Sequence, residues 1–320
     1  MHKSQYEKAG WIQHHSIVAH RQTCAPCLQP VVRSFAANVA RVESAWLLLP
    51  TLVDTSVTST KLSVQAVYEV LGTFDMDDPR QQDPVIQAAI QERFLALGMT
   101  HMQKIFDRED VLVALARFDH LLCHSQQPFV THGVETILAS QILNAWTAVE
   151  SFLKDLWETA VNHGPRQWTN RVLEAKAVRG LKEQERSVPL SILQRHEYDV
   201  RLKMGSILKA KVPFETLEEV LAAYATVFGE EITRTYTPAM LTETRALEAT
   251  RHLLAHRGGV VDRKFKGVVK QIARFASVEE GKQMHINGEM AGELARNGIA
   301  LSLAILDDVD QRLKQAEANS

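Results

Sequence analysis

The sequence predicts a mainly α-helical protein, because most of its long segments place apolar residues three or four positions apart. Glycine and proline, the residues that most often interrupt helices, account for only 15 and 10 of the 320 residues. The alternation of apolar and polar residues that is typical of half-buried strands is the weaker pattern in these segments. The expected fold is therefore all-α, a helical bundle with an additional helical N-terminal region.

Four helices are expected in the first part of the chain, at residues 28–50, 61–72, 85–97 and 108–124. The first carries an apolar stripe from Val31 to Trp46, and Pro50 is predicted to end it, because proline restricts the residue before it. Gly72 is the predicted stop of the second helix. The polar residues 73–84, which include several Asp and Pro, are expected to form the loop that follows.

A break in the helical pattern near Pro128 marks the expected domain boundary. It separates a helical N-terminal region, residues 1–127, from a helical bundle, residues 128–320. Within the bundle, helices are expected at residues 134–162, 189–210, 214–228, 238–257 and 289–315. The first of these has the clearest amphipathic stripe in the chain, so it is expected to lie at the centre of the bundle.

Composition places the chain among soluble globular proteins, since 45% of its residues are hydrophobic and 23% are charged. A formal net charge of −2 argues against a uniformly basic nucleic-acid binder, although a local basic cleft remains compatible with RNA as a substrate. No apolar run of ~18 residues predicts a membrane span, and the first residues lack the apolar core of a signal peptide. Three cysteines give no disulfide framework, so a cytoplasmic location is expected.

The stretch at residues 251–259, Arg-His-Leu-Leu-Ala-His-Arg-Gly-Gly, combines a fixed cation, two imidazoles and a helix stop. Thr237 and Gly258 are the expected caps of the helix that carries it. Arg251 can hold a phosphate with two donors, and His256 can donate or accept a proton near neutral pH. RNA supplies its own nucleophile, the 2′-hydroxyl, so these groups suffice for cleavage without a metal ion.

Helix geometry complicates this interpretation. Residues five apart, such as Arg251 and His256, point ~140° away from each other on an ideal helix. A distorted last turn before Gly258, or a second copy of the motif from a two-fold partner, is expected to complete the site. Glu248, by contrast, stacks with the two histidines, and is expected either to orient His252 or to pair with Arg251. From spacing alone a structural role at a capped helix end is favoured, because cations stabilise helix C-termini.

Residues 248–262, Glu-Ala-Thr-Arg-His-Leu-Leu-Ala-His-Arg-Gly-Gly-Val-Val-Asp, resemble the signature of the HEPN superfamily, the "higher eukaryotes and prokaryotes nucleotide-binding" domains. Ribonuclease branches of that family carry Arg-x4-6-His, usually with a polar residue directly after the Arg, which here is His252. Residues 145–156 resemble the first helix of the family, and residues 281–287 with the long helix after them resemble its ending. The resemblance covers about residues 134–315 and implies a HEPN-like helical bundle.

The resemblance implies a metal-independent endoribonuclease without a cofactor, acting on RNA as a homodimer. It implies that Arg251 and His256 are catalytic and that His252 is an auxiliary polar residue. Many relatives belong to toxin–antitoxin, abortive-infection or antiviral defence systems, which implies a possible neutralising or defence-system partner protein. Glu150, on the first helix of the bundle, is either a buried partner for Arg251 or a boundary residue. The alternative function is a non-catalytic interaction or RNA-binding scaffold.

Basic residues after the motif are candidate RNA contacts, although a solvated face is their default interpretation. They are Arg257, Arg263, Lys264 and Lys266. A second, smaller basic patch occupies residues 176–182.

Histidines and cysteines near the N-terminus form a weaker candidate site, for zinc. The candidate ligands are His14, His15, His20, Cys24 and Cys27. A turn with free thiols is favoured over zinc, because the tetrahedral ligand set is not clearly completed. Farther along the chain, His120 and His124 are interpreted as surface histidines, and Cys123 as a small buried hydrophobe.

Overall fold

The computed structural model describes residues 24–75, 77–102, 108–124, 128–175, 188 and 190–319. These residues are mainly helical and contain no β-strand; their one strand-like pairing is an isolated bridge between Val260 and Gln283. The all-α prediction is confirmed. Within the same residues, no helix combines the length and the apolar character that crossing a membrane requires.

The described residues form two compact units. The first, called here the N-terminal unit, comprises residues 44–134, and the second, the motif unit, comprises residues 24–43 together with 135–319. The motif unit thus includes residues 24–43, which the sequence assigns to the N-terminal region. Two long helices, α2 (Gln29–Leu71) and α5 (Pro128–His163), contribute to both units, because each continues through the division.

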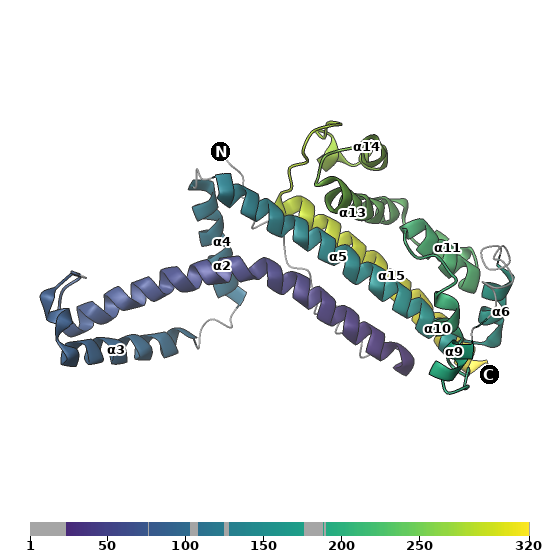
Figure 1. The fold of residues 1–320 in the computed structure, drawn as a ribbon, viewed down its shortest axis with the longest axis horizontal. Coiled ribbons are helices and arrows are strands. Elements are labelled where there is room, and N and C mark those ends of the chain that lie inside the picture. The colour runs from purple at the N-terminus through teal and green to yellow at the C-terminus, as the bar shows by residue number, and fades with distance from the viewer. Residues whose placement is uncertain are drawn as a thin grey trace. The chain divides into compact units, whose positions relative to one another are not determined.

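The motif unit is built around α5, α15 (Gly288–Ala318) and α13 (Pro238–Arg257), which lie side by side in Figure 1. Gly298 of α15 permits their close approach, since a Cβ there would lie 2.5 Å from the Leu247 side chain of α13 and 3.3 Å from that of Val149 of α5. The start of α2 covers α5 through stacked rings of Phe35 and Phe152, whose centroids are 4.1 Å apart.

Shorter helices complete the motif unit. They are α6 (Arg166–Glu174), α9 (Leu190–Arg195), α10 (Met204–Lys209), α11 (Leu217–Phe228), α12 (Glu231–Arg234) and α14 (Arg263–Val269), with 3-10 turns η2 (Pro26–Leu28) and η4 (Ala273–Phe275). Two buried hydrogen bonds fix α11 to α5: the Trp157 indole donates to the Ala223 carbonyl at 3.1 Å, and the Tyr224 hydroxyl donates to the Leu153 carbonyl at 2.7 Å. Because both polar groups are buried, these bonds also remove a desolvation penalty.

The motif helix α13 begins and ends where the sequence predicts. The Thr237 side chain accepts a hydrogen bond from the Met240 backbone N–H, and Gly258 adopts the left-handed conformation with φ of 59°. The N–H groups of Gly258 and Gly259 both donate to the Leu253 carbonyl, closing the helix. The predicted caps are confirmed, and they fix which residues stand in the last turn.

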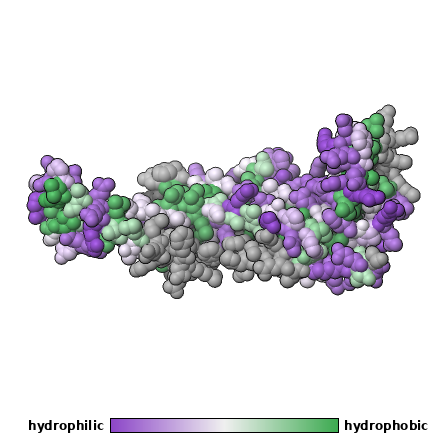
Figure 2. Space-filling model, turned by 90° about the horizontal axis from the view of Figure 1, so that it is seen from below, coloured by the Kyte–Doolittle hydropathy of each residue, from purple (hydrophilic) through white to green (hydrophobic). Residues whose placement is uncertain are grey.

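The N-terminal unit consists of the rest of α2, η3 (Pro79–Gln82), α3 (Pro84–Met102) and α4 (Arg108–His124). Ion pairs tie α2 to its neighbours, Glu69 to Arg93 of α3 and Asp54 to Arg117 of α4, the latter at 2.5 Å. None of the side chains described in α3 is buried. Figure 2 shows hydrophobic surface over the part of this unit that α2 and α3 form.

Two predictions about the extent of helices are wrong: residues 28–50 and 61–72 belong to one helix, and residues 189–210 do not form a single one. Pro50 lies inside α2, because a helix of 43 residues tolerates the loss of one backbone donor, and the Thr51 hydroxyl adds a bond to the Leu47 carbonyl at 2.8 Å. The helix expected at 189–210 is two short ones, α9 and α10. The link between them passes through three residues with positive φ, which no helix accommodates: Glu197, Tyr198 and Leu202.

Candidate active site

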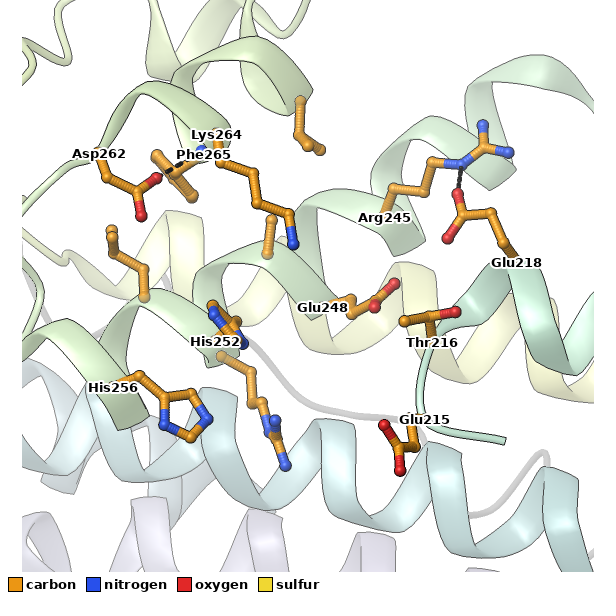
Figure 3. A pocket seen from close by; sticks show the side chains of 14 residues that line it. Glu215, Thr216, Glu218, Arg245, Glu248, His252, His256, Asp262, Lys264 and Phe265 are labelled. Atoms are coloured by element: carbon orange, nitrogen blue, oxygen red, sulfur yellow. Dashed lines mark hydrogen bonds and ion pairs between the residues drawn. The ribbon is translucent and has the colours of Figure 1, made fainter. Parts of the chain in front are cut away.

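Arg251, His252 and His256 line one pocket of about 400 Å³ in the motif unit. Lys264 of α14 reaches over the same pocket, whose other side is formed by the residues before α11 (Figure 3). The remaining lining residues are Glu215, Thr216, Glu218, Arg245, Glu248, Ala249, Leu253, Asp262, Phe265 and Val268. The motif therefore stands in a concavity of ligand size, within the usual range of roughly 300–1,000 Å³.

The geometry of α13 brings the three motif side chains to this pocket. His252 and His256 lie one turn apart, with ring centroids separated by 4.5 Å. Arg251 is half-buried, whereas both histidines are exposed. The backbone is α-helical through Arg257. Only the two hydrogen bonds that close the helix, from Gly258 and Gly259 to the Leu253 carbonyl, span more residues than an α-helical bond does. Arg251 and His256 thus reach the same pocket although the helix around them is not broken.

Two cations of the pocket are not engaged by the fold. Among the residues that the structure describes, none forms a hydrogen bond or an ion pair with the side chains of Arg251 and Lys264. An arginine in this state keeps its five N–H donors, arranged to match a phosphate or a carboxylate. The pocket therefore offers fixed positive charge to an anionic ligand.

Three of the acidic side chains that line the pocket have partners in the fold. Asp262 caps α14 by accepting the Phe265 N–H at 2.7 Å, and Glu218 pairs with Arg245 at 2.7 Å. One carboxylate oxygen of Glu248 accepts the backbone N–H of Leu217 at 3.2 Å. Arg245 neutralises the charge of Glu218, and the two backbone N–H groups occupy acceptors of Asp262 and Glu248. The unpaired cations therefore set the character of the motif end.

Two ionisable groups of the pocket have shifted pKa values. Burial raises the pKa of Glu248, and the nearby Glu218 adds to the rise, against the opposing effect of the Leu217 N–H. Desolvation lowers the pKa of His252, and the charges of His256, Lys264 and Arg251 lower it further. His252 is therefore favoured in its neutral form, the form that accepts a proton.

Several residues singled out from the sequence either lie outside the pocket or take another role than the expected one. Glu150 is not a partner for Arg251, because it pairs with Lys154 on its own helix at 2.8 Å. Glu248 takes neither of its two expected roles; its partner is the Leu217 backbone. Other candidates, all exposed and outside the pocket lining, are Arg257, which lies 3.8 Å from Asp262, and Arg263 and Lys266 on α14.

The zinc candidates find no support in the described residues, where no three His, Cys, Asp or Glu side chains are grouped to hold a metal ion. Cys24 is buried and Cys27 half-buried, and desolvation raises the pKa of both thiols, which disfavours the thiolate that zinc prefers. His120 is exposed on α4, as expected. The other positions lie outside the described residues or side chains: His14, His15, His20, Cys123, His124 and the patch at 176–182.

The sequence did not indicate the far side of the pocket, formed by Glu215, Thr216, Glu218 and Arg245. One local signal was present, because Thr216 and Glu219 have the spacing of a capping box, and the structure forms both of its hydrogen bonds. That signal locates the start of α11 but not its position beside α13. Only the tertiary fold brings the two together.

No protein-family model matches the chain, and neither a curated protein nor a solved structure matches it. The likeness to the HEPN superfamily therefore rests on the residues at 134–315 that carry it.

Proposed function

We propose that the protein is a metal-independent endoribonuclease with a HEPN-like site, in which Arg251 and His256 are the catalytic residues and the auxiliary His252 assists them as a proton acceptor. The observation that carries the proposal is their meeting in one pocket, with the guanidinium free of partners among the described residues. A purely structural pair at a helix end would not require both side chains to line the same concavity. The cationic end of this pocket suits a phosphodiester.

The chemistry follows from two imidazoles beside a fixed cation. One imidazole takes the proton of the RNA 2′-hydroxyl, whose oxygen attacks the phosphorus, and the other gives a proton to the departing 5′-oxygen. The lowered pKa of His252 suits it to the first task, which leaves the second to His256. Arg251 holds the phosphate and stabilises the added charge of the transition state. The products are a 2′,3′-cyclic phosphate and a 5′-hydroxyl.

The proposal extends to a homodimer in which two copies of the motif face each other, as the resemblance implies. It also includes a role in toxin–antitoxin, abortive-infection or antiviral defence, with a neutralising partner protein in the cytoplasm. These parts rest on the resemblance, whereas the catalytic assignment rests on the pocket as well.

The test is incubation of end-labelled RNA with the protein in excess EDTA. The wild type is expected to cleave, and Arg251→Ala and His256→Ala are each expected to lose about 10²–10⁴-fold in rate, the usual contribution of a positioned acid or base. His285→Ala is a matched control, because His285 is 87% exposed, pairs with Glu135 and does not line the pocket. Absence of cleavage by the wild type, or equal cleavage by the wild type and all variants, would contradict the proposal.

The second candidate function is a scaffold that binds RNA or protein without cutting. It is favoured by the position of His256 and Arg257 in the last turn of a helix with a glycine cap, where cations stabilise the helix dipole. It predicts RNA binding that survives His256→Ala, with no strand scission by the wild type. The same labelled RNA, analysed on native and denaturing gels, separates the two functions.

A further inference from the structure

The pocket extends well beyond the catalytic motif. Figure 3 shows His252 and His256 at one end and Glu215, Thr216 and Glu218 at the other, with Glu248 between them. The walls include apolar side chains of Ala249, Leu253, Phe265 and Val268. A phosphate occupies only the cationic end, so a ligand that fills the pocket needs a flat apolar body with a polar edge.

The carboxylate end has unused acceptors. Glu248 accepts the Leu217 N–H through Oε2 alone, and its Oε1 forms no hydrogen bond with a described residue. Glu215, exposed at the rim, likewise has no side-chain partner among those residues. The Thr216 hydroxyl accepts the Glu219 N–H, which leaves its own hydrogen free to donate. Acceptors therefore dominate this end, with a donor beside them.

This arrangement discriminates between the RNA bases. Guanine presents two adjacent donors, N1–H and the N2 amino group, next to the O6 acceptor, and a carboxylate matches two adjacent donors. Adenine and cytosine place a ring acceptor beside their amino donor, and uracil has one donor between two acceptors. Each of these edges would set an acceptor against a carboxylate oxygen, which leaves a partly buried polar group unpaired.

We propose that the carboxylate end of the pocket, formed by Glu248 with Glu215 and Thr216, binds a guanine base next to the phosphate held at the motif end. The inference rests on the proposed function, since it makes the RNA cut beside guanosine. The base lies against the apolar walls, and Glu248 is a specificity-determining residue rather than a proton carrier.

The test is isothermal titration calorimetry in EDTA with nucleoside monophosphates. Both the 3′- and the 5′-monophosphate of each nucleoside are used, because the phosphate can lie on either side of the base. At least one guanosine monophosphate is expected to bind about tenfold or more tighter than its adenosine, cytidine and uridine counterparts, the usual value of one good paired contact.

Glu248→Gln is expected to abolish this preference, because the amide puts a donor where the carboxylate had an acceptor, yet still accepts the Leu217 N–H. Glu150→Gln is the matched control, since Glu150 pairs with Lys154 outside the pocket and its loss should leave the preference intact. If Glu248→Gln fails to fold, Glu215→Gln at the exposed rim is expected to weaken guanosine binding selectively.

Equal binding of the four nucleotides, no binding of any, or a preference that survives both Glu248→Gln and Glu215→Gln would overturn the guanine site. Guanosine-selective binding by a protein that leaves RNA intact would instead overturn the proposed function and keep this inference. Cleavage of RNA without regard to base would overturn the guanine site and keep the proposed function.

Discussion

The two units of the protein use similar helices in different ways. The motif unit buries most of its large apolar side chains, among them Trp146 and Trp157 of α5. The N-terminal unit leaves many exposed; these are Leu48, Leu52, Tyr68, Phe74, Val85, Leu95, Met99 and Val113. Helical periodicity is present in both, so it predicts that a helix forms and not how closely its apolar face is covered.

The reason lies in what surrounds each helix. In the motif unit, α5 is covered by the start of α2, by α11 and by α15, through contacts as close as the one at Gly298. In the N-terminal unit, α3 meets α2 through an ion pair and buries none of its described side chains. The proposed catalytic motif thus lies in the more tightly packed unit, where side chains can be held in fixed positions.

The largest expected difference between the units is in local opening. Backbone amides of α5 and α15 are expected to exchange with solvent only at free energies near global unfolding, about 5 kcal/mol or more, whereas those of α3 open at much lower free energy. Hydrogen-exchange mass spectrometry measures both at once. Equal protection of α3 and α5 would contradict the expected difference in stability between the two units.

A matched pair of leucine truncations tests the same contrast. Leu156→Ala in α5, at 0% exposure, is expected to lower the free energy of unfolding by about 2–5 kcal/mol, because it leaves a cavity. Leu95→Ala in α3, at 55% exposure, is expected to change it by less than about 0.5 kcal/mol. Urea denaturation followed by circular dichroism gives both values; a large loss from Leu95→Ala would reveal a buried environment for α3.

A matched pair of glycine substitutions is expected to change the stability by smaller amounts, with opposite signs for the two variants. Gly298→Ala is expected to destabilise the protein by about 1–3 kcal/mol, because the added methyl meets Leu247 and Val149. Gly98→Ala in α3 meets nothing within 4 Å and is expected to stabilise by about 0.5–1 kcal/mol through helix propensity. Thermal melts distinguish the two, and a stabilising Gly298→Ala would refute the close approach of α5, α13 and α15.

The smallest expected effect is in the titration of His252. Its midpoint is expected below 6.5, and Lys264→Gln should move it upward, because one of the charges that lower its pKa is removed. The folded-state pKa of His252 lies below the unfolded-state pKa. Protonation of His252 therefore destabilises the folded state as the pH falls below the unfolded-state pKa, and this penalty is absent at higher pH. NMR of the imidazole, assigned with His252→Gln, measures the midpoint; a value above 6.5 would contradict the proposed environment.

How much the sequence could predict depended on whether the signal was local. The caps at Thr237 and Gly258 lie within a few residues of the helix they delimit, so both ends of α13 were predicted correctly. The prediction that Pro50 ends a helix was wrong, because it considered one residue and not the length and packing of the surrounding helix. The helix break at Glu197–Leu202 contains no glycine or proline from which it could be predicted.

The candidate site was predictable on the same terms. Arg251, His252 and His256 belong to one short motif and were found, and Lys264 follows it closely in the chain. Glu215 and Glu218 lie more than 30 residues before Arg251, so no spacing rule connects them to the motif. Of the two roles expected for Glu150, the pairing with Arg251 is the one the structure excludes, since Glu150 pairs with Lys154 on its own helix.

The central claim, that Arg251 and His256 direct attack by the RNA 2′-hydroxyl, is tested most directly by the ends of the cleaved strands. Mass spectrometry of a short RNA cut in excess EDTA should show a 2′,3′-cyclic phosphate and a 5′-hydroxyl, and a substrate with a 2′-deoxynucleotide at the cut site should resist. A 3′-hydroxyl with a 5′-phosphate, or cleavage of the deoxy substrate at an equal rate, would contradict the account.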